Sequence, residues 1–181
     1  NSHLQRTVGG KVSFTHLIGY AIVEALSEMP QLNVRYVLHD GKAAVEELAH
    51  VGFGLAIDIQ HGGERRLVVP VIHDADTLTF TQFVDAYQGI ITRTKKGELT
   101  AEDYQGATVT LTNPGTIGTT TSVPRLMSGQ GLIIGVGAMD YPAEFAGVSP
   151  RKLALMGIGK TMFVSSTYDH RVIQGAASGE F

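Results

Sequence analysis

One stretch near the end of the chain combines side chains that could move a proton. Residues 166–175 read STYDHRVIQG, and they place Asp169, His170 and Arg171 directly after a run that is typical of a β-strand. An imidazole titrates at a pKa of about 6.5, so it can take a proton from a substrate and return it at neutral pH. The alternative is that His170 is only a polar residue at the end of a buried strand.

The other histidines carry a weaker signal for chemistry. No two of them stand at the spacing of metal ligands on one helix face. His73 is followed by Asp74 and could bind a metal ion with it, but a polar pair at a strand end is the simpler interpretation. We predict no metal site, and we expect surface or hydrogen-bonded positions for His3, His16, His39, His50, His61 and His73.

Two glycine-rich stretches resemble nucleotide sites only in part. Residues 156–161 read MGIGKT, but Ala154 stands where a phosphate loop needs its first glycine, and a strand rather than a helix should follow. Residues 135–140 read GVGAMD and lack the third glycine of a dinucleotide fingerprint. No serine lies in a G-x-S-x-G elbow, and the chain has no cysteine. Any acyl chemistry would therefore use the thiol of another molecule.

The composition is typical of one globular domain. A chain of 181 residues can bury one core, and a second is not expected. Lys plus Arg is 14 and Asp plus Glu is 17, which gives a net charge of −3. This balance does not indicate the basic surface that binds nucleic acid. No apolar run reaches the roughly 18 residues of a membrane span and no signal-peptide pattern is present, so we expect the cytoplasm. The chain begins at Asn1 and ends at Phe181 in a segment that looks structured, so we expect part of a longer polypeptide.

The charged fraction points to contacts with other subunits. It is 17%, below the typical value of about 25%. A solvated monomer normally carries more charge, so we expect other subunits to cover part of the surface.

Two amphipathic helices are predicted from apolar residues at three-to-four spacing. The first runs from a cap at Ser13 to about Met29, before Pro30. Its expected buried face consists of Phe14, Leu17, Ile18, Ala21, Ile22, Ala25 and Leu26. The second covers residues 79–94 and ends near Gly97. Its expected buried face consists of Phe80, Phe83, Val84, Tyr87, Ile90 and Ile91.

Strands are predicted at six places along the chain. They cover residues 34–38, 51–59, 66–72, 106–115, 131–139 and 161–168. The dipeptide Asp40-Gly41 favours a hairpin turn after the first of them. Strands and helices are mixed without strict βαβ alternation, which indicates a mixed α/β fold of a kind that the pattern alone leaves open.

Three of these stretches together resemble a known family. The residues DHR-V-I-Q-G at 169–175 resemble the signature D-H-R-x-x-D-G of the acyltransferases of 2-oxoacid dehydrogenase complexes. Upstream, VTLTNPGTIGT at 109–119 resembles the strand and turn of the same family, and GLIIGVGAMD at 131–140 resembles its next apolar strand. The resemblance extends over nearly the whole chain. It implies a chloramphenicol-acetyltransferase-like mixed sheet with flanking helices in the α+β class, which forms a homotrimer, with an acyltransferase catalytic domain at residues 1–181.

The resemblance also implies roles for individual side chains. His170 would be the general base, and the Thr112 hydroxyl would stabilise the oxyanion of a thioester under attack by a thiol. Asp169 and Arg171 would hold the turn and orient the histidine. Asn113 and Gly115 would shape the bend that presents Thr112. In the family the histidine and the hydroxyl come from neighbouring subunits.

One position departs from the family pattern. Gln174 stands where the general pattern has aspartate, and glutamine is uncharged but can form hydrogen bonds. We interpret this change as a mark of the branch found in the multifunctional 2-oxoglutarate enzyme of mycobacteria and corynebacteria. The loss of the carboxylate bears on the efficiency of transfer.

The branch resemblance implies a reaction in the tricarboxylic acid cycle. The domain would move a succinyl group between dihydrolipoamide and coenzyme A, and a thiamine-diphosphate-dependent 2-oxoglutarate dehydrogenase/decarboxylase with Mg²⁺ would lie in another part of the chain. The lipoyl group would come from a separate lipoylated acyltransferase, with dihydrolipoamide dehydrogenase as a further partner. The competing hypothesis is a structural and regulatory module, which would form trimers and sense acyl-coenzyme A.

Overall fold

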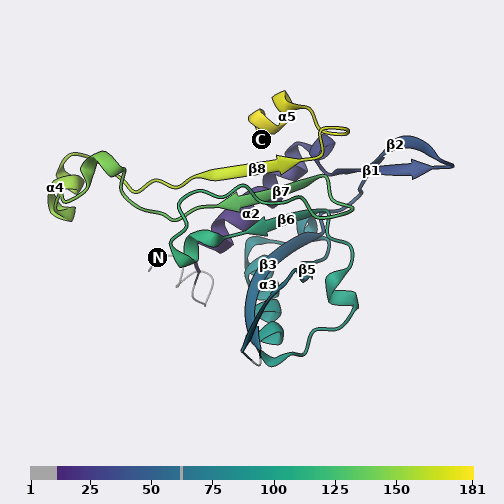
Figure 1. The fold of residues 1–181 in the computed structure, drawn as a ribbon, viewed down its shortest axis with the longest axis horizontal. Helices are drawn as coiled ribbons and strands as arrows, with labels where there is room; N and C mark the ends of the chain where they lie inside the picture. The colour runs from purple at the N-terminus through teal and green to yellow at the C-terminus, as the bar shows by residue number, and fades with distance from the viewer. Residues whose placement is uncertain (1–11, 62) are drawn as a thin grey trace.

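A mixed β-sheet forms the centre of the fold in the computed structural model, which describes residues 12–61 and 63–181 (Figure 1). The six-stranded sheet has the order β4 (Glu64–Val68), β3 (Phe53–His61), β6 (Val109–Thr112), β7 (Leu132–Val136) and β8 (Val164–Tyr168), and β5 (Val71–Ile72) pairs with the start of β3. Strands β3, β6 and β7 are parallel, whereas β4, β5 and β8 run antiparallel to their neighbours. The prediction of a mixed α/β fold is confirmed.

The strand predicted at residues 66–72 was wrong in one respect, because it is two strands. Residues 64–68 continue the β3 hairpin as β4, and residues 71–72 pair with the start of β3 as β5. Pro70 lies between them, and proline has no N–H to give to a ladder. Its carbonyl still accepts a hydrogen bond from the Leu55 N–H at 2.8 Å. The chain therefore stays beside β3 while the ladder is interrupted.

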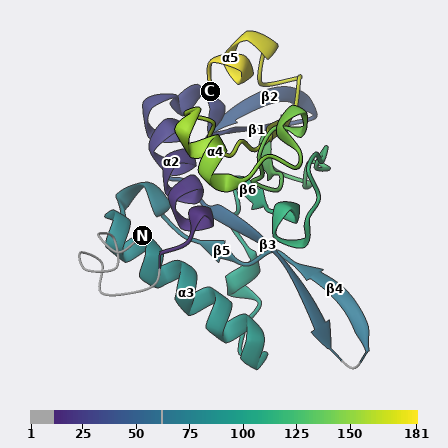
Figure 2. The same ribbon diagram turned by 90° about the vertical axis from the view of Figure 1, so that its left-hand side faces the viewer.

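Helices α2 (Phe14–Glu28) and α3 (Phe80–Lys96) contact each other and lie on the same side of the central sheet (Figure 2). Both were predicted, and both have capping boxes, formed by Ser13 with His16 and by Thr79 with Gln82. Helix α3 ends at Gly97 in the left-handed conformation, which glycine adopts at low cost.

The predicted buried face of α2 was partly wrong. Phe14 and Leu17 are 62% and 37% exposed, and the residues that face the core are His16, Gly19, Ile22, Val23 and Leu26. The reason is packing: a Cβ on Gly19 would lie 3.1 Å from the Phe83 ring and 3.3 Å from the Phe53 ring. The helix therefore places its smallest residue against two aromatic rings, so Ile22 and Leu26 of the predicted face stay buried while Phe14 and Leu17 point outward.

A separate hairpin projects from the sheet near its β7–β8 side (Figure 1). It consists of β1 (Val34–His39) and β2 (Lys42–Glu47), which pair only with each other among the described strands. The turn residues Asp40 and Gly41 have φ of 51° and 75°, as the predicted Asp-Gly hairpin requires.

A long excursion between β7 and β8 carries α4 (Pro150–Leu155) away from the sheet (Figure 1). The MGIGKT stretch leaves this helix through Gly157, at φ 71°, and leads toward β8, as the turn prediction required. The last helix is α5 (Gly175–Glu180), which the sequence pattern did not predict. Within the described ranges, no helix has the length and apolar character needed to cross a membrane.

Candidate active site

The His170 turn is fixed to the central sheet on both sides. The Asp169 N–H donates to the Gly131 carbonyl at 2.9 Å, immediately before β7 begins. The Val172 and Ile173 N–H groups then donate to the Asp169 carbonyl at 3.0 and 2.9 Å. Ile173 is buried in the core. The backbone that carries His170 is therefore held at a defined place at the end of β8.

Asp169 and Arg171 bind each other rather than the histidine between them. The Arg171 Nε and Nη2 atoms donate to the Asp169 carboxylate at 2.8 and 2.6 Å, and the Arg171 backbone N–H donates to it at 3.0 Å. The hydrogen bond from Arg171 lowers the pKa of Asp169 below its ordinary value, and the same bond raises the pKa of Arg171. The guanidinium carbon of Arg171 also lies 3.7 Å from the centre of the Tyr36 ring.

The His170 side chain is exposed at this turn. Its ring centre lies 5.5 Å from that of Tyr168, at a tilted angle. No hydrogen bond joins its imidazole to any other residue in the ranges 12–61 and 63–181. The ring is thus free to meet a molecule from outside.

The predicted bend after β6 is present, and it begins at Thr112. The Asn113 side-chain amide donates to the Thr15 hydroxyl at 2.9 Å, and a 3-10 turn follows at Pro114–Ile117. A Cβ on Gly115 would lie 2.3 Å from the Gly137 carbonyl carbon. Only glycine can approach the neighbouring backbone so closely, which supports the predicted part of Gly115 in the bend.

A cleft of about 450 Å³ opens beside Thr112. Its walls are formed by Thr15, Ala56, Ile57, Asp58, Leu67, Tyr87, Ile91, Thr112, Asn113, Pro114, Thr116 and Ile117. The one carboxylate among them, Asp58, is bound by Arg65 of the neighbouring strand. The pKa of Asp58 is lowered by this hydrogen bond. The other walls are apolar or carry uncharged hydroxyl and amide groups, so the cleft can hold a long uncharged chain against Thr112.

Thr112 and His170 lie toward opposite ends of the sheet. Thr112 pairs with Gly135, and Gly135 pairs with Ser165. Tyr168 is three residues further along β8, or about 10 Å, and two strand spacings of about 4.8 Å separate β8 from β6. His170 lies beyond Tyr168. One copy of the chain therefore cannot bring both side chains to the same carbonyl group.

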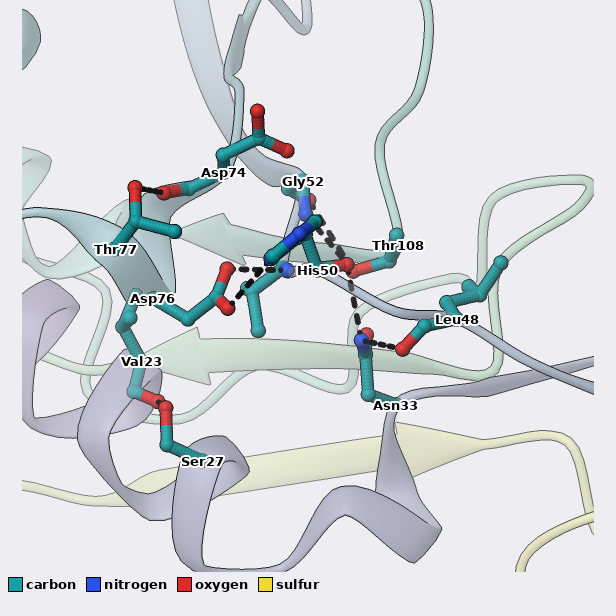
Figure 3. Close-up of polar contacts among 11 residues, drawn as sticks. Val23, Ser27, Asn33, Leu48, His50, Gly52, Asp74, Asp76, Thr77 and Thr108 are labelled. Carbon is teal, nitrogen blue, oxygen red and sulfur yellow. Dashed lines mark hydrogen bonds and ion pairs between the residues drawn. The ribbon is translucent and has the colours of Figure 1, made fainter.

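A second histidine–carboxylate pair lies at the start of β3 (Figure 3). His50 Nδ1 lies 3.0 Å from Asp76 Oδ2, and the other Asp76 oxygen accepts from the Val51 N–H at 2.7 Å. The hydrogen bond to Asp76 raises the pKa of His50 above its ordinary value. The Asn33 side-chain amide donates to the Leu48 and His50 carbonyls at 2.9 and 3.0 Å. This pair holds loops together, as the prediction of hydrogen-bonded histidines required.

The remaining histidines fit the same expectation where the structure describes them. His16 is buried, and its Nδ1 accepts from the Ser13 N–H at 3.2 Å while its Nε2 lies 2.9 Å from the Gln88 side-chain nitrogen. Burial lowers the pKa of His16. His39 and His73 are exposed, whereas His3 and the side chain of His61 lie outside what the structure describes. No group of three or more metal-ligating side chains occurs in the part of the chain that the structure describes.

Three contributors to the two turns could not be predicted from the sequence. Thr15 binds Asn113, Tyr36 stacks on Arg171, and Gly131 accepts the Asp169 N–H. Each lies far from its partner in sequence, and no motif assigned it a part in either turn. Only the glycine at the start of an apolar strand gave a weak sign of close backbone approach.

The sequence model of one protein family, the 2-oxoacid dehydrogenases acyltransferase (catalytic domain), matches residues 1–181. The chain belongs to this family. The Multifunctional 2-oxoglutarate metabolism enzyme of Mycobacterium sp. (strain JLS) is 59% identical over 182 residues, which cover 100% of this chain and 14% of that protein. The acyltransferase domain thus spans about one seventh of the length of this relative.

Solved structures agree with the family assignment. The cubic core of the pyruvate dehydrogenase multienzyme complex has 26% sequence identity and a TM-score of 0.76, over 99% of this chain and 70% of that chain. The dihydrolipoamide acetyltransferase of Azotobacter vinelandii gives the same four values. The study of that enzyme's structure concerned the roles of a serine, a histidine and an asparagine in its catalytic mechanism, and the asparagine follows the histidine by four residues.

The expected fold type is also confirmed. Chloramphenicol acetyltransferase has 16% identity and a TM-score of 0.54 over 98% of this chain and 77% of that chain, a likeness of fold alone. The acyltransferase domain has the mixed sheet and flanking helices that the motifs implied.

Proposed function

We propose that this acyltransferase domain moves a succinyl group between dihydrolipoamide and coenzyme A. The proposal is supported by family membership and by the 59% identity to an enzyme named for 2-oxoglutarate metabolism, because oxidation of 2-oxoglutarate yields a succinyl group. Coenzyme A and the lipoyl group are the two thiol carriers of this reaction, and the lipoyl group arrives on a partner protein. Thiamine diphosphate and Mg²⁺ remain predictions for other parts of a longer chain.

His170 supplies the base for this transfer. A free thiol has a pKa of about 8.5, so only a few per cent of it is thiolate at neutral pH. The imidazole takes the proton of the attacking thiol as sulfur bonds to the thioester carbonyl carbon. It returns the proton to the departing sulfur when the old carbon–sulfur bond breaks. The thiols change places on the succinyl group, and the enzyme is unchanged.

Thr112 stabilises the intermediate of this exchange. The tetrahedral carbon carries a negatively charged oxygen, and a fixed hydroxyl donor lowers its energy by about 2.7–4 kcal/mol. The Asn113–Thr15 hydrogen bond and the tight packing at Gly115 fix the bend that carries this hydroxyl. The cleft beside Thr112 admits the uncharged arm of a thiol carrier.

Two copies of the chain complete one site. The observation that carries the proposal is the position of Thr112 and His170 toward opposite ends of one sheet, with the His170 imidazole exposed. A second copy would place its Thr112 opposite this His170. The cubic core formed by the pyruvate dehydrogenase relative supports self-assembly, and we propose a homotrimer as the unit. A lipoylated acyltransferase and dihydrolipoamide dehydrogenase are the further partners proposed.

Gln174 is compatible with transfer. It is exposed at the start of α5, and its side chain makes no capping bond there. In the Azotobacter acetyltransferase an asparagine, which also ends in an amide, follows the studied histidine at the same spacing of four residues. We propose that the amide at this position serves the reaction in place of a carboxylate.

Complementation between inactive variants tests the proposal. His170→Ala and Thr112→Val should each lose succinyl transfer from succinyl-dihydrolipoamide to coenzyme A. When both variants are co-expressed in one assembly, about a quarter of the sites combine an intact His170 with an intact Thr112, and activity should return.

Two outcomes would count against this account. Absence of recovery, with mixed assemblies verified by differently tagged copies, would contradict the shared site. Wild-type transfer by both single variants would contradict the catalytic roles and favour the structural and regulatory module instead.

A further inference from the structure

The hairpin formed by β1 and β2 touches the His170 turn, although it lies outside the central sheet. A Cβ on Gly131 would lie 2.1 Å from the Val34 carbonyl oxygen, so the first residue of β1 lies against the start of β7. The Gly131 carbonyl in turn accepts the Asp169 N–H. The base of the hairpin is therefore part of the support under the turn.

Tyr36 extends this contact from the backbone to the side chains. It is two residues beyond Val34 on β1, and its ring lies under the Arg171 guanidinium at 3.7 Å. The Arg171 side chain is 62% exposed, so its ion pair with Asp169 is screened by water and would by itself be weak. A guanidinium stacked on an aromatic ring is held in one plane, which favours the two-pronged contact with a carboxylate.

The Arg171 guanidinium occupies the Asp169 carboxylate and so limits which other residues Asp169 can bind. The Asp169 side chain is only 12% exposed, and both its oxygens accept hydrogen bonds from Arg171. A carboxylate next to a histidine in sequence can otherwise pair with it. The same chain gives an example at the hairpin turn, where His39 Nε2 lies 3.7 Å from Asp40 Oδ2.

We propose that Tyr36 is a positioning residue for the acyl-transfer site: it holds Arg171 on Asp169 and so prevents Asp169 from pairing with His170. The inference rests on the proposed role of His170 as the base. A base must be neutral to accept a proton, and an ion pair with Asp169 would favour its protonated form. The titratable groups that the structure places around the turn are Asp169, Arg171, Tyr36 and Tyr168.

The pH dependence of kcat/KM for succinyl transfer by the assembled enzyme tests this inference. Tyr36→Leu removes the ring, so we expect the acidic limb of the profile to move to higher pH by about half a unit, with an unchanged plateau. Below the limb this shift lowers the rate about threefold. Tyr36→Phe keeps the ring and should keep the wild-type profile. Val45→Ala is the matched control, since Val45 pairs with Tyr36 on β2 and is exposed.

A double variant separates positioning from general damage. In an Asp169→Asn background the competing carboxylate is gone, so adding Tyr36→Leu should leave the acidic limb where it is. A uniform loss of rate at every pH in Tyr36→Leu, or a limb that does not move, would overturn the inference. If His170→Ala keeps the wild-type rate, the proposed function itself fails. Loss of transfer in His170→Ala with an unmoved limb in Tyr36→Leu rejects only the part assigned to Tyr36.

Discussion

His50 and His170 lie toward the same end of the central sheet, and each has a carboxylate close by. Asp76 binds the His50 ring directly and also accepts the Val51 N–H. Asp169 does not bind the His170 ring, because its carboxylate accepts hydrogen bonds from Arg171, and the His170 ring stays exposed. One histidine is bound into the fold, and the other is presented on a fixed backbone with its ring free.

The two histidines differ in which residue binds the neighbouring carboxylate. Among the described residues no Lys or Arg pairs with Asp76, and its hydrogen bond to His50 raises the pKa of His50. At the other position an arginine, always charged and able to donate two parallel bonds, outcompetes an imidazole for the same carboxylate. A histidine beside an acid is thus a candidate base when a third residue holds that acid.

The largest contrast is expected from removing each histidine in turn. His170→Ala should lower kcat for succinyl transfer about 10²- to 10⁴-fold, the usual contribution of a positioned acid–base group. His50→Ala should leave kcat nearly unchanged, because its ring is bound to Asp76 away from both predicted catalytic residues. Steady-state kinetics with succinyl-dihydrolipoamide measures both variants. Equal losses in the two variants would remove the distinction drawn between these histidines.

Thr112 completes the contrast, because it is expected to act on the intermediate rather than on a proton. Thr112→Val removes the hydroxyl at nearly constant volume, and kcat should fall about 10²- to 10³-fold with little change in KM. Thr112→Ser keeps the hydroxyl and should retain much of the activity. Single-turnover transfer rates check both. A rise in KM with kcat intact would instead assign Thr112 to substrate binding.

Two glycines allow the supports of the two histidines to be disturbed separately. Gly131→Ala places a Cβ 2.1 Å from the Val34 carbonyl oxygen beneath the His170 turn, and Gly52→Ala places one 1.8 Å from the Gly106 carbonyl oxygen near His50. Both should lower the free energy of unfolding by about 1–3 kcal/mol, as overpacked sites do.

Activity should separate the two glycine variants. The transfer rate of the folded fraction should fall further in Gly131→Ala, because its backbone carries the acceptor for the Asp169 N–H. Denaturant unfolding and kcat per folded site are the two measurements. Equal activity per folded site would show that the turn tolerates movement of β7.

The sequence predicted the elements with local signals. The cap at Ser13 and the following Pro30 marked the first long helix, and Gly97 marked the end of the second. The Asp40-Gly41 dipeptide marked the β1–β2 hairpin. The errors arose where long-range packing decides the outcome. Gly19 lies against two aromatic rings contributed by β3 and α3, and nothing in the periodicity of α2 reveals them.

In the candidate site too, local motifs were predictable from the sequence and long-range contacts were not. The motifs pointed to His170 and Thr112, and the structure places both at the ends of strands of one sheet. Their separation follows from strand order and direction, which the sequence pattern left open. The contact of Tyr36 with Arg171 joins residues 135 positions apart, 171 − 36, and a single sequence carries no trace of such a pair.

The smallest expected effect is the pH dependence of stability at the His50–Asp76 pair. The pKa of His50 is raised, so its contribution is fully present below its ordinary value of 6.5 and is lost as pH rises through the folded-state pKa. For Asp76, burial raises the pKa, but the hydrogen bonds from His50 and Val51 outweigh it and the net shift is downward from 3.8. Its contribution is therefore present above 3.8 and is lost as pH falls through the lowered value.

Both groups stabilise the fold between pH 3.8 and 6.5, where His50 is a cation and Asp76 is an anion in the folded protein. His50→Gln should lower Tm in this window and lose its effect at alkaline pH, whereas Asp76→Ala should lower Tm throughout neutral pH because the Val51 N–H also loses its acceptor. Thermal unfolding from about pH 4 to about pH 9, a range in which His50 titrates and Asp76 stays ionised, measures this. His170→Gln is the matched control. The His170 ring has no hydrogen-bond or ion-pair partner within the described chain, so the Tm of this variant should follow the wild type at every pH. A Tm difference for His170→Gln that matched that of His50→Gln would show that His170, too, is bound into the fold.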